Sequence, residues 1–228
     1  MSTTSEQRRH MVERDIQGRG VRDLRVLAAM AEVPREKFLP PELADLAYAD
    51  QPLPIGAGQT ISQPYIVAHM TEALRVEPDE DVLEIGTGSG YAAAVLGLVA
   101  RRVFTIERHA ELADVARVRL AALGYTNIEV RCGDGTLGWP EHAPYGAIVV
   151  AAGGPQAPPA LLHQLAIGGR LVMPVGSSRA QELLRVTRVG PTEYRHEGLG
   201  AVLFVPLIGE YGWEEGEGDA GHWAPPAR

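Results

Sequence analysis

The segment DVLEIGTGSGY, residues 81–91, constrains the fold more than any other part of the chain. A short apolar run at 82–85 is typical of a β-strand, and alternate glycines, Gly86, Gly88 and Gly90, follow it. Glycine there lets the backbone turn sharply and approach a ligand closely before a helix begins. The segment predicts a strand, a tight turn and a helix, with a ligand at the turn. A tight turn can also require glycine for steric reasons alone.

Apolar runs alternate with helical patterns after this point, as in a parallel sheet with helices on both faces. Strands are predicted at 82–85, 102–106, 128–131, 147–151 and 170–175, and helices at 91–99, 110–123 and 159–166. Two last runs, 182–188 and 194–206, have no helix between them and predict antiparallel strands at the sheet edge. The expected fold is α/β, a doubly wound, mostly parallel, Rossmann-like sheet of seven strands with antiparallel C-terminal strands and an N-terminal helical extension.

The sequence before residue 81 predicts a helical segment followed by a loop. Residues 5–39 carry apolar side chains at helical spacing. Residues 48–62 hold two prolines and two glycines without any period, which predicts an ordered loop or lid. Ser62 then stands where a helix N-cap would, with Pro64 in the first turn and the helix ending near Arg75.

Composition limits the partners of the chain. Its 228 residues include 21 basic and 29 acidic ones, a net charge of -8, which disfavours nucleic acid and anionic membranes. The single cysteine, Cys132, excludes an intramolecular disulfide and a Cys-rich metal site, so no metal is expected. The N-terminus is polar and the longest apolar run is too short to span a bilayer, so a cytoplasmic location is expected.

We expect three parts along the chain. Residues 1–80 form the N-terminal helical segment with the active-site loop, and residues 81–212 form the ligand-binding core. Residues 213–228, acidic and rich in glycine, are expected to be a flexible tail.

Acidic residues at two later strand ends indicate a nucleoside ligand. Glu107 ends the second predicted strand of the core, where doubly wound folds place a carboxylate that accepts hydrogen bonds from ribose hydroxyls. Asp134, followed by Gly135, comes after the third strand, at the same edge of the sheet. Alone, Asp134 would be read as part of an exposed turn. Ligand-binding features at three successive strand ends indicate a binding site instead.

The glycine spacing distinguishes two cofactors. Dinucleotide enzymes usually show G-x-G-x-x-G, where a helix N-terminus receives a pyrophosphate. This chain has G-x-G-x-G preceded by Glu84. A carboxylate there would repel a pyrophosphate but suits a ligand with a sulfonium and an ammonium group. The spacing therefore favours S-adenosylmethionine over NAD, and a dehydrogenase remains a distant alternative.

Residues 8–212 resemble the protein-L-isoaspartate O-methyltransferases, a family with the class I methyltransferase fold. The resemblance depends on MVERDIQGRGVRD, VPREKFLP, AYADQPLPIGAGQTISQPYIVAHM, VLEIGTGSGYAAAVL, TIER, GYTNIEVRCGDGTLGW, GGRLVMPVG and FVPLIG. The segment GQTISQPYIVAHM is the discriminating one. The resemblance implies methyl transfer from S-adenosylmethionine to isoaspartyl (and D-aspartyl) residues of damaged proteins by a monomer, with repair through a succinimide.

The resemblance also implies roles for individual residues. Glu84, Gly86, Thr87 and Gly88 would hold the methionine part of the cofactor, Glu107 the ribose, and Asp134 with Gly135 the adenine side. Gln59, Thr60, Ile61 and Ser62 would form the loop over the reacting centre, with Ser62 as the active-site serine.

The chemistry leaves Ser62 with two possible roles. A substrate carboxylate has a pKa near ~4 and is already ionised at neutral pH, so no general base is required. The hydroxyl of Ser62 then orients the substrate carboxylate, or it only caps the following helix. The sequence alone does not separate the two.

Two departures from the family pattern leave other functions open. Gly146 and Ala151 stand where the family usually has an aspartate and a threonine. Together with the tail, they support an alternative, a dedicated methyltransferase that esterifies an aspartate in one partner peptide. A cofactor-binding module without catalysis is a third possibility, disfavoured by the intact Glu84, Glu107, Asp134 and Ser62.

Overall fold

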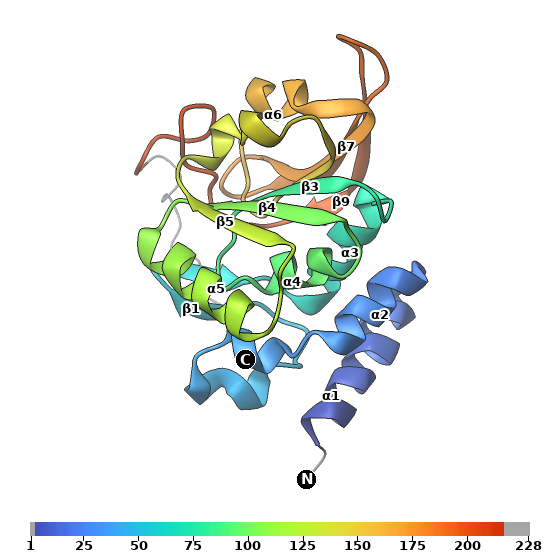
Figure 1. The fold of residues 1–228 in the computed structure, drawn as a ribbon, viewed down its shortest axis with the longest axis vertical. Helices are drawn as coiled ribbons and strands as arrows, with labels where there is room; N and C mark the ends of the chain where they lie inside the picture. Colours follow the sequence, from blue (N-terminus) through green and yellow to red (C-terminus); the bar gives the residue numbers. More distant parts are fainter. Residues whose placement is uncertain (1–2, 217–228) are drawn as a thin grey trace.

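The computed structural model describes residues 3–216, so most of the predicted flexible tail lies outside the described residues. A sheet of seven strands in the order β5-β4-β3-β6-β7-β8-β9 runs through the molecule (Figure 1). The strands are β3 Asp81–Ile85, β4 Arg102–Glu107, β5 Ile128–Cys132, β6 Tyr145–Val150, β7 Leu165–Gly176, β8 Gln181–Arg188 and β9 Tyr194–Val202. Strands β3 to β7 pair in parallel, whereas β8 and β9 pair antiparallel. The predicted mostly parallel sheet with antiparallel C-terminal strands is confirmed.

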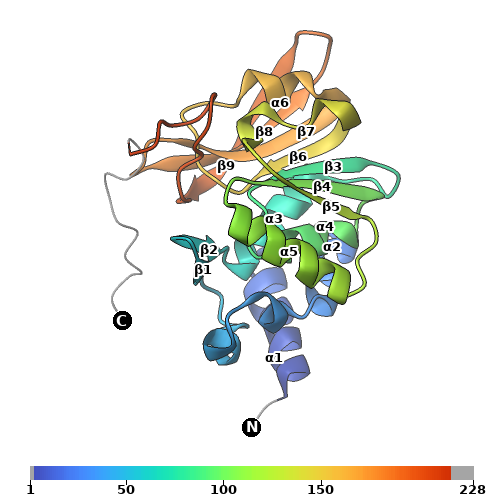
Figure 2. The ribbon, with the colours of Figure 1, turned by 60° about the vertical axis from the view of Figure 1, so that its left-hand side comes forward.

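Helices cover both faces of the sheet (Figure 2). On one face lie α3 Pro64–Leu74, α4 Tyr91–Gly97 and α5 Ala110–Ala122, and on the other lies α6 Pro159–His163. Successive strand residues point to opposite faces, so Val82 packs with the first group while Leu83 packs with the second. Because both faces are covered, the central strands read as nearly continuous apolar runs in the sequence.

The predicted N-terminal helical extension is present but interrupted. Its elements are α1 Thr4–His10, a π-helix Met11–Ile16, a 3-10 helix Gln17–Arg19, α2 Leu24–Glu32, and 3-10 helices Arg35–Phe38 and Pro41–Leu46. The chain breaks at Gly20, whose φ is 111°, and Asp23 then caps α2 by accepting the backbone N–H of Arg25 at 2.8 Å.

The expected loop at 48–62 contains a hairpin that the sequence did not predict. Strand β1 Leu53–Gly56 pairs antiparallel with β2 Gln59–Ile61. Ala57 and Gly58 form the turn with φ of 49° and 69°, the left-handed conformation that tight hairpins require. The sequence did not predict these strands because both are short and β1 contains Pro54. The two buried apolar residues that pair, Leu53 and Ile61, also lie at opposite ends of the hairpin sequence.

The order of the strands reverses between β3 and β6. The chain moves outward from β3 through β4 to β5 and then returns to the other side of β3. The connections that follow β3 and β6 therefore leave the sheet in opposite directions. A space remains between these connections at the carboxyl ends of the two strands. In open α/β sheets, ligands bind in the crevice at this point.

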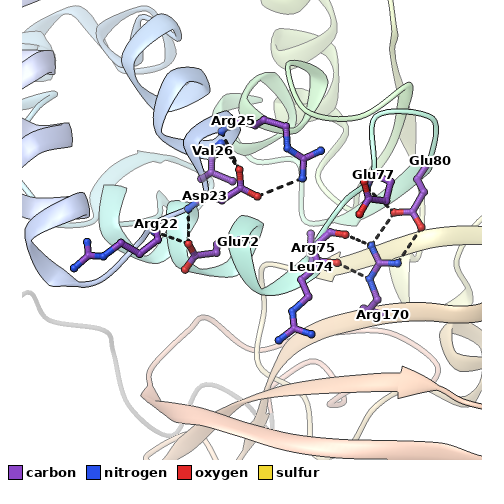
Figure 3. Close-up of polar contacts among 10 residues, drawn as sticks. All are labelled: Arg22, Asp23, Arg25, Val26, Glu72, Leu74, Arg75, Glu77, Glu80 and Arg170. Carbon is purple, nitrogen blue, oxygen red and sulfur yellow. Dashed lines mark hydrogen bonds and ion pairs between the residues drawn. The ribbon is translucent and has the colours of Figure 1, made fainter.

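Helix α3 is anchored at its C-terminal end by the polar contacts in Figure 3. Arg170 of β7 donates to the carbonyl oxygens of Leu74, at 2.6 Å, and of Arg75. Glu72 accepts the backbone N–H groups of Arg22 at 2.6 Å and of Asp23 at 2.8 Å. The helix is thus tied both to the sheet and to the segment that enters α2.

Arg170 also explains the departure from the family pattern at Gly146. It pairs with Glu80 through two hydrogen bonds of 2.9 and 2.7 Å, and a Cβ atom at Gly146 would overlap the Glu80 side chain. Burial alone would raise the pKa of the Glu80 carboxyl, but the hydrogen bonds from Arg170 hold that pKa below its ordinary value. A carboxylate from Glu80 therefore fills the space beside Gly146, at the amino end of β6 and away from the crevice.

Gly146→Asp should lower the free energy of unfolding by about 1–3 kcal/mol, because its side chain overlaps Glu80 and adds a second carboxylate there. In a Glu80→Ala background the same change should cost less, since the new carboxylate can replace the lost partner of Arg170. Urea unfolding of the four proteins measures this coupling. An equal cost in both backgrounds would contradict the exchange.

Candidate active site

A cavity lies at the carboxyl ends of β3, β4 and β6, where the strand order reverses. Its wall includes nine of the residues predicted from the sequence: Gln59, Thr60, Ile61, Ser62, Gly86, Thr87, Gly88, Glu107 and Gly135. The fold thus brings the hairpin region, the glycine loop and the ends of two further strands around one space. Their roles toward a ligand stay predictions.

The glycine loop owes its composition to its backbone conformation. Gly86, Gly88 and Gly90 have φ of 94°, 53° and 90°, which side-chain-bearing residues rarely adopt. A Cβ atom on Gly88 would also lie 3.2 Å from the side chain of Ile55, because the β1–β2 hairpin packs over this loop. Glycine therefore allows the turn of the loop, and at Gly88 it also leaves room for the β1–β2 hairpin that packs on the loop.

Glu107 is held rigidly in the cavity wall. Its Oε2 accepts the backbone N–H of Gly88 at 2.8 Å, and its Oε1 accepts that of His109 at 3.0 Å. Each carboxylate oxygen keeps a second lone pair, which can accept a hydroxyl group. A fixed carboxylate with free acceptor capacity at the end of β4 matches the requirement for binding a ribose.

Glu84 lies behind the glycine loop and is absent from the cavity wall. Its Oε2 accepts the hydroxyl of Thr105 at 2.5 Å, and that hydroxyl lies 2.6 Å from the hydroxyl of Thr87. Strand alternation explains the difference from the sequence prediction, because Ile85 faces the cavity and Glu84 therefore points to the opposite face. The geometry does not support direct contact between Glu84 and the methionine part of a cofactor.

The Glu84 carboxyl is fully buried, and its Oε1 has no hydrogen-bond partner within residues 3–216. Burial raises the pKa of Glu84 to about 8. The hydrogen bond from Thr105 acts to lower this pKa, and the negative charge of Glu107 acts to raise it. The group is therefore mainly a neutral acid at neutral pH.

Asp134 makes hydrogen bonds within its own turn and to the C-terminal segment. Its Oδ1 accepts both the backbone N–H and the hydroxyl of Thr136, at 2.8 and 2.7 Å, and its Oδ2 accepts the N–H of Glu210 at 2.8 Å. It does not line the cavity, although the neighbouring Gly135 does. Asp134 instead holds the C-terminal segment beside the third strand end, so contact with an adenine is not supported by this arrangement.

The sequence prediction missed the C-terminal segment as part of the cavity. Val205, Pro206, Leu207 and Ile208 line it, because the N–H of Leu207 donates to the carbonyl of Gly153 at 2.8 Å and draws this segment to the end of β6. Its apolar run FVPLIG was available as a signal, but nothing in its spacing relates it to the strand ends.

A second cavity, of about 380 Å³, opens beside the first. Its wall combines polar groups of the hairpin and α3 with apolar groups around the end of β9: Arg19, Pro52, Thr60, Ser62, Gln63, Tyr65, Ile66, His69, Ala151, Leu199, Ala201, Val202, Leu203, Phe204 and Val205. Four residues, Thr60, Ser62, Ala151 and Val205, belong to both walls. The two spaces therefore meet beside Ser62, as a transfer between two bound molecules requires.

The structure excludes Ser62 as the cap of α3. The N-cap residue is Gln63, without a side-chain cap of its own, and Asp50 accepts the N–H of Tyr65 at 2.9 Å instead. Within residues 3–216, the hydroxyl of Ser62 makes no hydrogen bond. The prediction of a capping role is wrong, and the hydroxyl is available to a ligand.

Two further features bear on the class of site. Within residues 3–216, no group of three or more His, Cys, Asp or Glu side chains is placed to hold a metal ion. In the same range, no helix is long and apolar enough to cross a membrane. The sheet order with its antiparallel C-terminal strands, the G-x-G-x-G loop and the fixed carboxylate at the end of β4 match the class I methyltransferase fold expected from the sequence.

Comparisons with known proteins give the particular family. The family described as protein-L-isoaspartate(D-aspartate) O-methyltransferase matches residues 6–212. A protein-L-isoaspartate O-methyltransferase of Rhodopseudomonas palustris is 62% identical over 208 residues, 91% of this chain and 95% of the relative. A solved protein-L-isoaspartate O-methyltransferase superposes with a TM-score of 0.80 at 30% identity, over 90% of this chain and 67% of that one. The chain belongs to the protein-L-isoaspartate O-methyltransferase family.

A more distant structure shares the fold. It is a putative protein-L-isoaspartate O-methyltransferase from Plasmodium falciparum, solved with S-adenosyl-L-homocysteine, with a TM-score of 0.75 and 23% identity. It covers 88% of this chain and 98% of its own. The enzyme class and its S-adenosylmethionine cofactor follow from family membership.

Glu84→Gln should make the stability of the protein less dependent on pH. The folded pKa of about 8 lies above the ordinary value of 4.5, so between them the unfolded chain releases a proton that the folded chain keeps. Stability from this group therefore falls as pH rises, by up to about 1.4 kcal/mol per pH unit, and glutamine removes that loss. Urea unfolding at intervals across this pH range tests it, and a mutant-to-wild-type difference that stays constant with pH would contradict it.

Proposed function

We propose that the two cavities divide the reaction between them, with S-adenosylmethionine in the cavity of the glycine loop and the substrate peptide in the second. The protein methylates the carboxylate of L-isoaspartyl (and D-aspartyl) residues in damaged proteins, which starts their repair through a succinimide. The observation that carries the proposal is the shared wall, which is formed by Thr60, Ser62, Ala151 and Val205.

The residues of the first cavity suit this cofactor. A Cβ atom on Gly135 would overlap Ile85, so the glycine keeps the wall open beside the end of β5. Glu107 would accept the ribose hydroxyls, while the backbone at Gly86 to Gly88 would lie against the methionine part. Gln59, Thr60 and Ile61 would cover it from the hairpin side.

The residues of this protein act by aligning the two reactants, and none of them has to transfer a proton. When bound, S-adenosylmethionine supplies a methyl group whose leaving group is a neutral thioether. The substrate carboxylate, with a pKa near ~4, is ionised at neutral pH, so no side chain has to remove a proton. Ser62 donates its hydroxyl to this carboxylate and aligns it. Alignment of two bound reactants can recover roughly 7–11 kcal/mol of barrier.

The alternative of one dedicated peptide substrate rests on Ala151. Gly146 lies at the other end of β6 and is accounted for by Glu80, so it gives no reason to change the substrate. Ala151 borders both cavities, and a threonine there would add a hydroxyl beside the reacting groups. Apolar groups such as Leu199, Val202 and Phe204 line much of the second cavity and suit peptides of varied sequence.

Several isoaspartyl peptides of unrelated sequence, each beside its aspartyl twin, should all be methylated, with the aspartyl twins inert. The measurement is base-labile incorporation of the labelled methyl group. Methylation of a normal aspartate in one partner only would support the dedicated enzyme. Cofactor binding by calorimetry with no ester on any peptide would support a binding module instead.

Ser62→Ala should lower kcat roughly 10- to 100-fold, the worth of one hydrogen bond to a charged group, while stability stays unchanged because no cap is lost. Steady-state kinetics with an isoaspartyl peptide and urea unfolding measure the two effects. Ser178→Ala, at an exposed position in the turn between β7 and β8, is a matched control on the surface. Full turnover in Ser62→Ala would refute the orienting role.

Further proposals concern partners and organisation. We propose that the protein is a monomer. We also propose that it does not bind nucleic acid, which its net charge of -8 supports, and that it is cytoplasmic, which its single cysteine supports. We also propose that residues 1–80 carry the active-site loop and residues 81–212 the cofactor core. Light scattering during gel filtration tests the oligomeric state.

A further inference from the structure

The N-terminus of α3 is held by a carboxylate from outside the helix. The helix begins at Pro64, and its N-cap residue Gln63 offers no side-chain cap. Asp50, from the segment before the hairpin, supplies the acceptor, with Oδ1 at 2.9 Å from the backbone N of Tyr65. Since a helix N-terminus leaves several N–H groups without intrahelical partners, this bond fixes where the first turn lies.

The second oxygen of Asp50 gathers two more groups. Its Oδ2 accepts from Nε2 of Gln63 at 2.8 Å and from a guanidinium nitrogen of Arg19 at 2.8 Å. The same Gln63 amide also donates to the carbonyl of Asp50 at 2.9 Å. The guanidinium of Arg19 lies over the ring of Tyr65, 3.6 Å from its centre. Arg19, Asp50, Gln63 and Tyr65 form one unit, which we call the Asp50 clamp.

Ser62 directly precedes this clamp. Its own hydroxyl makes no hydrogen bond within residues 3–216, so its position depends on the backbone on either side. On one side Ile61 is fixed by pairing with Leu53 in the hairpin, and on the other Gln63 is fixed by Asp50. The clamp thus sets where the hydroxyl stands relative to the two cavities.

We infer that Asp50 is a positioning residue for methyl transfer: through Gln63 and Tyr65 it holds Ser62 where the two cavities meet. The inference rests on the orienting role of Ser62 proposed above. Asp50 lines neither cavity, but its partners Arg19, Gln63 and Tyr65 line the second. Asp50 therefore acts on the reaction through the residues that it holds, and the contact with Gln63 leads directly to Ser62. A displacement of about 1 Å at a reacting centre can cost about 100-fold in rate, which is enough for a group outside the cavity to matter.

Asp50→Asn separates the clamp from the helix cap. The asparagine oxygen can still accept the N–H of Tyr65, but its amide nitrogen would face the donors of Gln63 and Arg19. We expect kcat for an isoaspartyl peptide to fall about 10-fold, with the KM for S-adenosylmethionine within about twofold of wild type. Asp45→Asn, an exposed carboxylate in the preceding 3-10 helix, is the matched control and should keep wild-type kinetics.

The decisive measurement is a double-mutant cycle with Ser62→Ala. If Asp50 acts through Ser62, Asp50→Asn should change kcat little in the Ser62→Ala background. Additive losses, or wild-type kinetics in Asp50→Asn, would overturn the inference. A normal kcat in Ser62→Ala alone would instead refute the orienting role itself, so the two failures are distinguishable.

A second variant covers the effect of Asp50 on folding. The buried guanidinium of Arg35 is also stabilised by the charge of Asp50, so Asp50→Asn can lower stability for a separate reason. Gln63→Met keeps the charge of Asp50 but removes the side chain through which Asp50 holds residue 63, which directly follows Ser62. Its melting temperature should stay within about 3 °C of wild type, and its loss of kcat should again vanish in the Ser62→Ala background. Additive losses in this second cycle would overturn the inference as well.

Discussion

The active site depends on the left-handed turn after β3, which Glu107 fixes by accepting a hydrogen bond from the backbone of Gly88. Three glycines allow the turn, and the carboxylate of Glu107 accepts the N–H of Gly88 and so joins the ends of β3 and β4. That bond places a carboxylate and a row of backbone atoms at the one point where the strand order reverses. The hairpin, the C-terminal segment and the end of β6 then complete the cavity around a frame that is already fixed.

Helix α3 relates this frame to the substrate side. Its C-terminal end is tied to β7 by Arg170 and to the N-terminal segment by Glu72, while its first turn is held by Asp50. A helix fixed at both ends keeps the residue before it in place at low entropic cost, because few conformations remain to be lost on binding. This explains why a site that needs no general base still needs an N-terminal extension packed against the core.

Two carboxyl groups outside the cavity wall, those of Glu84 and Asp134, hold other parts of the site in position. The sequence predicted ligand contacts for Glu84, which stands before the glycine loop, and for Asp134, which follows the third strand of the core. In the fold, Glu84 supports the loop from behind through Thr105 and Thr87, and Asp134 secures the C-terminal segment. Both remain close to the site without forming its wall, so their influence on a ligand would pass through the residues that they hold.

The sheet, its parallel core, its antiparallel edge and the glycine turn could be predicted from the sequence, because they follow from local patterns: apolar periodicity, glycine and strand-end carboxylates. The glycine spacing and the family resemblance also identified nine residues of the cavity wall, including the glycine loop, Glu107 and Ser62. Four features became visible only in the folded chain: the face that Glu84 takes, the capping of α3 by Asp50 rather than Ser62, the space beside Gly146 that Glu80 fills, and the closure of the cavity by Val205 to Ile208. Each of these depends on groups that are distant in the chain and meet only when the sheet is assembled, so no local pattern could predict them.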